Sequence, residues 1–177
     1  MLSKEQKQRL IALHGYEWVD EEDDQSTAER LHTILSRIDS IEELWYAASV
    51  VEWAPEDGDL DFFRNHPLCD RGLALRLYWG FQPDHYYRQK DKGKALGKEE
   101  RARFTVMKEI EADLLAGRYP RELIAFDPKD VVGREITDED RSRPGLRHIP
   151  KELRIPTTGA MYALDYTVAV FGPNGGA

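Results

Sequence analysis

The sequence of 177 residues contains a single cysteine, Cys69. A lone cysteine excludes an intrachain disulfide, argues against a metal site built from several thiolates, and fits a reducing compartment. Long hydrophobic runs are also missing, since none approaches the roughly 20 apolar residues that cross a bilayer. The first ten residues, MLSKEQKQRL, are charged and lack the apolar stretch of a secretory signal. We therefore expect a cytoplasmic protein without a membrane-spanning helix.

Catalytic motifs are absent as well. The sequence has no G-x-S-x-G, and its glycine clusters do not join a strand to a helix as a phosphate loop does. The histidine spacings match no metal-binding template such as H-E-x-x-H. We therefore expect no cofactor, no metal and no enzymatic activity. One alternative is an enzyme of unknown reaction with a site near His66, Cys69, Asp70 and His85, in which a thiol and an imidazole act as nucleophile and base.

Charge is distributed unevenly along the chain, whose net charge is −8. Residues 1–63 hold 16 Asp and Glu against 5 Lys and Arg, a net charge of −11. Such an acidic front half repels nucleic-acid phosphates and attracts a basic partner. An ordinary solvated surface is the other interpretation of an acidic stretch.

Helix signals dominate the first two thirds of the chain. Capping-box patterns begin at Ser3, Ser26 and Ser40, and each predicts a helix that starts there. Leu10, Ile11 and His14 recur at helical spacing in the first of these helices. We also expect a short helix capped by Asp59, and an amphipathic helix over residues 99–116 that ends at Gly117.

The segment from residue 65 to residue 87 predicts the centre of the fold. Asp70 is a good N-cap for a helix over residues 71–81, which is apolar on nearly every side. We expect Arg76 and Gly80 to form a narrow polar strip on this helix, which neighbours bury on its other faces. After it, Asp84 can cap the short aromatic segment that follows.

Beyond Pro120 the pattern changes to short β-branched or aromatic stretches separated by proline, glycine and aspartate. Residues 123–126, 131–136 and 166–171 predict strands, although residues 162–171 also suit a last helix. The expected fold class is mainly α, a compact multi-helix body with a small C-terminal strand-and-loop appendage. The expected organisation is a helical domain at residues 1–117 with an extension at residues 118–177 packed on it.

One stretch resembles a known family. The residues concerned are Trp53, Asp57-Gly58, Asn65-His66-Pro67, Cys69-Asp70, Ala74 and Leu77-Tyr78-Trp79. Over residues 41–88 they are similar to the DUF4274 family of bacterial domains of unknown function. The chain departs from the family pattern at Pro55-Glu56, and the part after residue 90 lies outside it. The resemblance implies a bacterial, mostly helical domain of the kind found near toxin genes, and it supplies no catalytic residues.

These observations favour a non-catalytic protein-binding module, with an immunity protein that neutralises a basic toxin as the specific case. A structural or adaptor protein is a further alternative. We expect the partner to be a basic protein, and neither nucleic acid nor a membrane. The residues expected to contact it are the acidic and aromatic side chains Asp20, Glu21, Glu22, Asp23, Asp24, Trp53, Glu56, Asp57, Asp59, Asp61, His85, Tyr86 and Tyr87.

Overall fold

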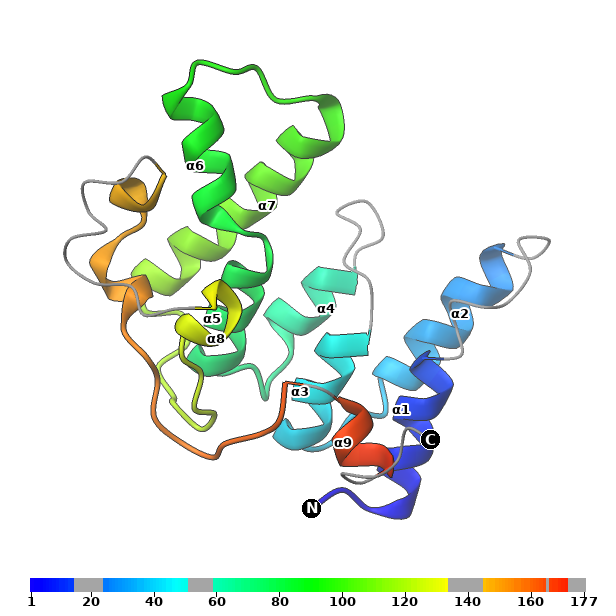
Figure 1. The fold of residues 1–177 in the computed structure, drawn as a ribbon. Helices are drawn as coiled ribbons and strands as arrows, with labels where there is room; N and C mark the ends of the chain where they lie inside the picture. Colours follow the sequence, from blue (N-terminus) through cyan, green and yellow to red (C-terminus); the bar gives the residue numbers. More distant parts are fainter. Residues whose placement is uncertain (15–23, 51–58, 134–144, 165, 172–177) are drawn as a thin grey trace. The chain divides into compact units, whose positions relative to one another are not determined.

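The computed structural model describes residues 1–14, 24–50, 59–133, 145–164 and 166–171. Over these ranges the chain is mainly helical, with nine α-helices and two short 3-10 helices (Figure 1). The predicted mainly α fold class is therefore confirmed. The chain divides into two compact units, which we call unit 1 (residues 1–68 and 162–177) and unit 2 (residues 69–161). The boundary expected after residue 117 lies inside unit 2.

Unit 1 is built around the pair α1 and α3. Its helices are α1 (Lys4–His14), α2 (Asp24–Leu35), α3 (Ile41–Val50), α4 (Asp59–Asn65) and α9 (Tyr166–Phe171). Helix α1 packs against α2, α3 and α9, and α9 also packs against α3. Leu44 and Trp45 of α3 are completely buried, as is Leu10 of α1. Ile11 is 46% exposed, contrary to expectation, because Leu13 shares the buried side of α1 with Leu10.

Two of the three predicted capping boxes mark helix starts. The Ser3 hydroxyl accepts from the Gln6 N–H at 3.2 Å, and the Gln6 amide oxygen accepts from the Ser3 N–H at 2.8 Å. Ser40 likewise accepts from the Glu43 N–H at 3.2 Å, at the start of α3. Helix α2 instead begins at Asp24, so the start predicted at Ser26 is wrong by about one half-turn.

Unit 2 contains α5 (Arg71–Gly80), α6 (Pro83–Asp91), α7 (Lys98–Leu115) and α8 (Lys129–Val132), with the 3-10 helices η4 (Leu146–His148) and η5 (Lys151–Arg154). Helix α7 packs against α5, α6 and η5, while η4 packs against α6. Met107, Ile110 and Leu114 are buried along the predicted apolar stripe of α7. Gly117 follows α7 with φ +72°, as a left-handed C-terminal cap requires.

Helix α5 is the buried centre of unit 2, as predicted. The carboxylate of Asp70 accepts from the Leu73 N–H at 2.9 Å and caps the first turn. Every residue from Gly72 to Trp79 is buried. The expected polar strip is wrong at Arg76, whose exposed fraction is 9%, because packing surrounds α5 on that side too.

The junction between α5 and α6 also differs from expectation. Gln82 adopts a left-handed conformation with φ +54° and precedes Pro83, the first residue of α6. Asp84 therefore lies inside the helix and does not cap it. Its carboxylate accepts from Arg88 at 2.8 Å, one turn further along α6.

The predicted C-terminal strands are wrong where the structure describes them. Residues 123–126 contribute a single parallel bridge, between Ile124 and Ala160, and residues 129–132 form α8. Residues 166–171 form α9, whose Val170 is buried. The β-branched sequence of this last segment favours a strand only weakly, and packing on α1 and α3 outweighs that preference. Residues 134–136 of the second predicted strand lie outside the described ranges.

Candidate functional site

The aromatic segment His85-Tyr86-Tyr87 lies in α6, with two of its three rings buried. Tyr86 and Tyr87 have exposed fractions of 7% and 5%. Tyr86 packs against Phe104 of α7, with ring centroids 5.8 Å apart. His85 is half-buried and contacts Tyr86 edge-on at 5.5 Å. This burial favours a packing role for both tyrosines and leaves His85 as the most accessible member of the segment.

A buried carboxylate connects α5, α6 and α7. Glu111 of α7 accepts hydrogen bonds from the Tyr78 hydroxyl at 2.9 Å and the Tyr87 hydroxyl at 2.7 Å. Lys108, one turn earlier on α7, forms an ion pair with the same carboxylate and donates to the Tyr87 hydroxyl at 3.0 Å. Glu111 thus has donors from all three helices, which is how a buried charge is tolerated.

The environment of Glu111 keeps both phenols protonated. Burial and the neighbouring carboxylate raise the pKa of Tyr78 far above its usual value. Burial also raises the pKa of Tyr87 to about 12, although Lys108 opposes the shift. Burial lowers the pKa of Lys108, but its hydrogen bonds to Glu111 and Tyr87 outweigh that effect and raise it overall. The cluster therefore holds a lysine ammonium group and two phenolic hydrogen-bond donors at neutral pH.

A second polar cluster joins the end of α6 to η4. Asp91 accepts from the Gly145 N–H at 2.9 Å and from Arg147 at 2.5 Å, and its carboxylate is also hydrogen-bonded to His148 Nε2 at 2.7 Å. These donors hold the pKa of Asp91 well below its usual value, with His148 the largest cause. The His148 ring also packs on Tyr87, with centroids 5.5 Å apart.

Sequence reasoning missed both clusters. Glu111 interrupts the apolar stripe of α7, four residues after Met107 and three before Leu114, so its polar character at a core position was an available signal. No comparable signal existed for Asp91 and His148, which are 57 residues apart in the chain. Only the packing of η4 against α6 brings them together.

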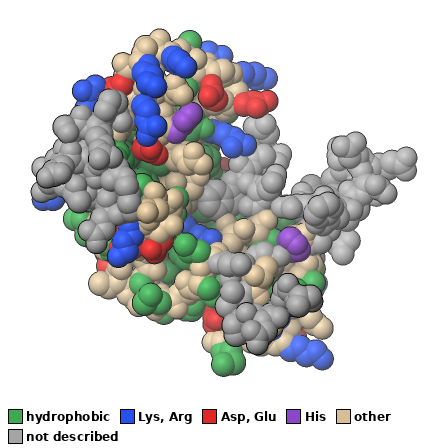
Figure 2. Space-filling view, viewed as in Figure 1, with side chains coloured by type: hydrophobic (Ala, Val, Ile, Leu, Met, Phe, Trp, Pro, Cys, Tyr) green, Lys and Arg blue, Asp and Glu red, His purple; other side chains and the backbone are tan. Residues whose placement is uncertain are grey.

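Exposed cations surround the connection between α6 and α7. Six of them lie between residues 90 and 103, and we call this group the basic tip: Lys90, Lys92, Lys94, Lys98, Arg101 and Arg103. Figure 2 shows Lys and Arg side chains gathered over the end of unit 2 where Figure 1 places this connection, with some acidic side chains among them. None of the six forms an ion pair with another residue that the structure describes.

The acidic segments expected to bind a partner are only partly described. Asp20, Glu21, Glu22, Asp23, Trp53, Glu56 and Asp57 lie outside the described residues. Asp24 and Asp59 are the first residues of α2 and α4, so Asp59 begins its helix and does not precede it as a cap. Asp61 is described completely. Its side chain is 67% exposed and accepts from Arg64 at 3.2 Å.

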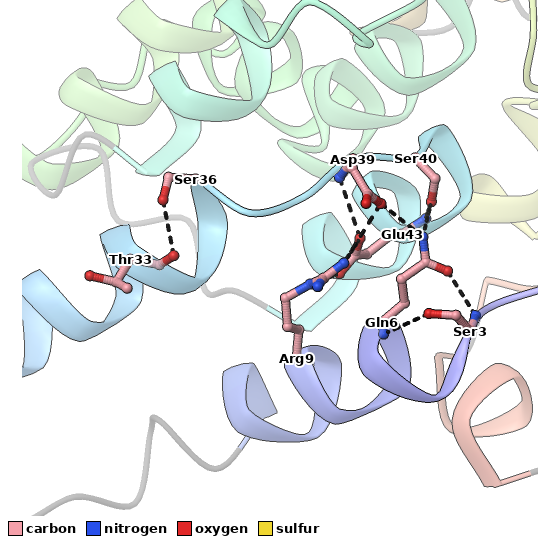
Figure 3. Close-up of polar contacts among 8 residues, drawn as sticks. All are labelled: Ser3, Gln6, Arg9, Thr33, Ser36, Asp39, Ser40 and Glu43. Carbon is pink, nitrogen blue, oxygen red and sulfur yellow. Dashed lines mark hydrogen bonds and ion pairs between the residues drawn. The ribbon is translucent and has the colours of Figure 1, made fainter.

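The acidic residues of unit 1 include one buried carboxylate, shown in Figure 3. Glu43 of α3 is completely buried and accepts two hydrogen bonds from Arg9 of α1, at 2.6 and 2.9 Å. This pairing raises the pKa of Arg9. Asp39 lies beside the pair, accepts from Gln6 at 2.9 Å, and keeps 70% of its side chain exposed. Glu43 therefore serves the α1–α3 contact, whereas Asp39 faces solvent.

The four residues of the alternative enzymatic site have separate structural contacts. The His66 ring, in unit 1, accepts from the Leu68 N–H at 3.1 Å. Cys69 is buried next to Asp70 in unit 2, and its Sγ lies 3.8 Å from the Asp70 carbonyl oxygen. His85 follows the opposite end of α5, and ten helical residues span roughly 15 Å. The structure thus does not gather Cys69, Asp70 and His85 at one point.

Asp70 has a second structural contact besides its cap. Its other carboxylate oxygen accepts from the Leu123 N–H at 2.6 Å and the Ile124 N–H at 2.7 Å. One buried side chain therefore fixes the start of α5 and the segment that pairs with Ala160. Backbone donors occupy both oxygens, an arrangement typical of a structural carboxylate.

Among the described residues, no three His, Cys, Asp or Glu side chains come together in a way that could hold a metal ion. No helix in the described ranges combines the length and apolar character needed to cross a bilayer. Comparison of the chain with known protein families, curated proteins and solved structures gives no match. The resemblance to DUF4274 stays a prediction.

Proposed function

We propose that the protein is a non-catalytic, cytoplasmic protein-binding module whose unit 1 takes a basic protein partner. An immunity protein that neutralises a basic toxin is the specific case. The observation that carries the proposal is the division of charge between the two units. Unit 1 holds 17 Asp and Glu against 6 Lys and Arg, whereas unit 2 holds 16 against 19. The net charge is −11 for unit 1 and +3 for unit 2, so the net negative charge of the chain belongs to one compact unit.

A concentration of one sign of charge on one unit has a kinetic consequence. It steers an oppositely charged partner toward that unit and raises the association rate. Unit 1 neutralises its buried Glu43 internally with Arg9, so that carboxylate adds little to the outer field. Asp39 and Asp61 are exposed for most of their surface and remain available to a partner. These positions support an acidic contact surface on unit 1.

The contacts of the buried carboxylates support the non-catalytic part of the proposal. Asp70 and Glu111 receive their hydrogen bonds from groups that belong to the fold: backbone N–H groups for the first, phenols and a lysine for the second. A general base needs a carboxylate or imidazole that can reach the proton of a substrate. The carboxylates of Asp70 and Glu111 are already engaged in hydrogen bonds within unit 2, so they are not placed to reach a substrate.

The test is association kinetics with the protein that the chain captures from its host lysate. In one variant Asp57, Asp59 and Asp61 are changed to Lys; in a matched control Glu99, Asp130 and Glu152 are changed to Lys. The two triples alter net charge equally, but the control positions are exposed sites of unit 2. We expect the first variant to associate more slowly, with the difference shrinking as salt shortens the screening length from about 8 Å. Replacing Asp59 at the start of α4 costs about 0.3–1 kcal/mol of stability.

The controls separate the possible outcomes. Equal slowing by both triples would mean that only the net charge of the chain matters, which contradicts a surface on unit 1. Unchanged rates in both would mean that the acidic segments are ordinary solvated surface, and His85 would be the next position to test. An acidic captured partner would also contradict the proposal.

A further inference from the structure

The basic tip of unit 2 carries more positive charge than its ion pairs with described residues neutralise. Residues 90–103 contain six cations and three carboxylates. Asp91 is engaged with Gly145, Arg147 and His148, and Glu100 accepts from the Gly97 N–H at 2.8 Å. These two carboxylates already serve structural contacts, which leaves the exposed Glu99 beside six exposed cations. The tip therefore presents a positive surface to solvent.

The fold fixes this surface in place. Helix α6 ends at Asp91, α7 begins at Lys98, and the two helices pack against each other, so the cations lie on the connection between two packed helices and on the turns that flank it. Asp91 also brings Arg147 to the same end of α6, and the arginine side chain is still 51% exposed. The cations thus lie on and beside one connection between packed helices of unit 2.

We propose that the basic tip binds an acidic segment of a protein partner. Exposed ammonium groups form ion pairs with carboxylates that are individually weak but collectively significant. The proposal is independent of the acidic surface on unit 1, because it concerns the other unit and a ligand of opposite charge.

Two observations favour an acidic polypeptide over nucleic acid. Residues 88–103 contain no Trp, Tyr or Phe, so the tip lacks the aromatic platforms on which single-stranded bases stack. The chain as a whole carries a net charge of −8, which also disfavours a long polyanion, whereas a short acidic segment experiences less of that repulsion. The tip thus fits a local cluster of Asp and Glu.

The experiment measures fluorescence anisotropy of a labelled peptide of ten glutamates, titrated with the full chain at low salt. In the test variant Lys92, Lys94 and Lys98 are changed to Gln. In the control Lys4, Arg37 and Lys151 are changed to Gln, which removes the same charge from exposed positions elsewhere. We expect the test variant to bind the peptide roughly tenfold more weakly, and the control to differ from the wild type by less than about twofold.

A second probe, a ten-nucleotide oligothymidylate, distinguishes the ligand classes. We expect it to bind more weakly than the glutamate peptide. Equal or tighter binding of the oligonucleotide would overturn the proposal in favour of a phosphate-binding surface. Absence of peptide binding, or equal weakening by the test and control variants, would overturn it as well. Circular dichroism of each variant checks that the helices are intact.

Discussion

Individual acidic residues of this chain have two distinct roles. Glu43, Asp70 and Glu111 are buried, and each receives hydrogen bonds from a different part of the fold. Exposed carboxylates such as Asp39 and Asp61 instead keep most of their surface in water. Composition alone does not separate the two groups, because a carboxylate is tolerated in a core wherever enough donors surround it.

The tyrosine pair of α6 provides a matched test of the Glu111 cluster. Tyr87 donates to Glu111, whereas Tyr86 is equally buried and its hydroxyl forms no hydrogen bond with a described residue. Tyr87→Phe should therefore cost about 1.5–3 kcal/mol of unfolding free energy, the usual range for a hydrogen bond to a charged group. Tyr86→Phe should cost less than about 0.5 kcal/mol. Urea unfolding measures both, and equal costs would show that Glu111 does not depend on Tyr87.

His66 gives unit 1 a pH dependence whose sign follows from its surroundings. Burial lowers its pKa below the ordinary 6.5, although a backbone hydrogen bond at Ile38 opposes the shift. Between the lowered pKa of folded His66 and the ordinary pKa of the unfolded chain, the unfolded state binds more protons than the folded state. The free energy of unfolding should therefore fall as the pH decreases through this interval. Urea unfolding between about pH 7.5 and pH 5.5 tests this. His66→Asn should reduce the fall, while His32→Asn, an exposed change on α2, should leave it intact; equal curves for both would contradict it.

At the scale of the helix, the burial of Arg76 changes the prediction for the expected polar strip of α5. The sequence pattern suggests that Arg76→Ala is nearly neutral, but the burial of Arg76 predicts a measurable loss. Leu77→Ala should cost about 2–5 kcal/mol, as deletion of a large core side chain does. Arg76→Ala should cost at least about 1 kcal/mol, since the arginine stem packs against its neighbours. Arg103→Ala, on the exposed part of α7, is the control. If Arg76→Ala costs no more unfolding free energy than this control, the original prediction of a polar strip at Arg76 would be correct.

Helices were predictable where local signals and packing agree. The cap at Asp70, the capping box at Ser3 and the apolar stripe of α7 all specify structure within a few residues of themselves. The C-terminal segment was ambiguous, because residues 162–171 suit both a strand and a helix; the structure has the helix α9, which packs on α1 and α3. Gly72 shows the same limit, since a Cβ there would collide with the carbonyl of Ile124, more than 50 residues away.

The sequence predicted one of the candidate surfaces, the acidic one, but not the burial of the aromatic segment. Charge counting identified an acidic front half, residues 1–63, all of which lies in unit 1. The burial of Tyr86 and Tyr87 depends instead on α7, which packs against α6 and covers them. The Asp91–His148 contact likewise depends on the packing of η4 against α6. Long-range packing of this kind leaves no short sequence signal.

For the whole molecule, the decisive feature is that both ends of the sequence contribute to one unit. The described part of the C-terminal segment makes polar and aromatic contacts with unit 1, in addition to the packing of α9 on α1 and α3. The Trp45 indole donates to the Ala163 carbonyl at 2.9 Å, Tyr46 contacts Tyr162 edge-on at 6.2 Å, and Lys7 donates to the Val170 carbonyl at 3.4 Å. Unit 1 is thus discontinuous in sequence, whereas unit 2 is one continuous stretch.

Removing residues 162–177 should therefore destabilise unit 1 and spare unit 2. The deletion exposes the surface of α1 and α3 that α9 covers, and loss of the buried Val170 side chain alone is worth about 1.5 kcal/mol or more. Hydrogen exchange resolved by segment should show lower protection in α1 and α3, with protection in α5 and α7 unchanged. Trp45→Phe, which keeps an aromatic ring but loses the donor to Ala163, should reproduce part of the effect. Equal loss of protection in both units would mean that the chain unfolds as a single cooperative body, and unchanged protection everywhere would mean that α9 contributes nothing to the core of unit 1.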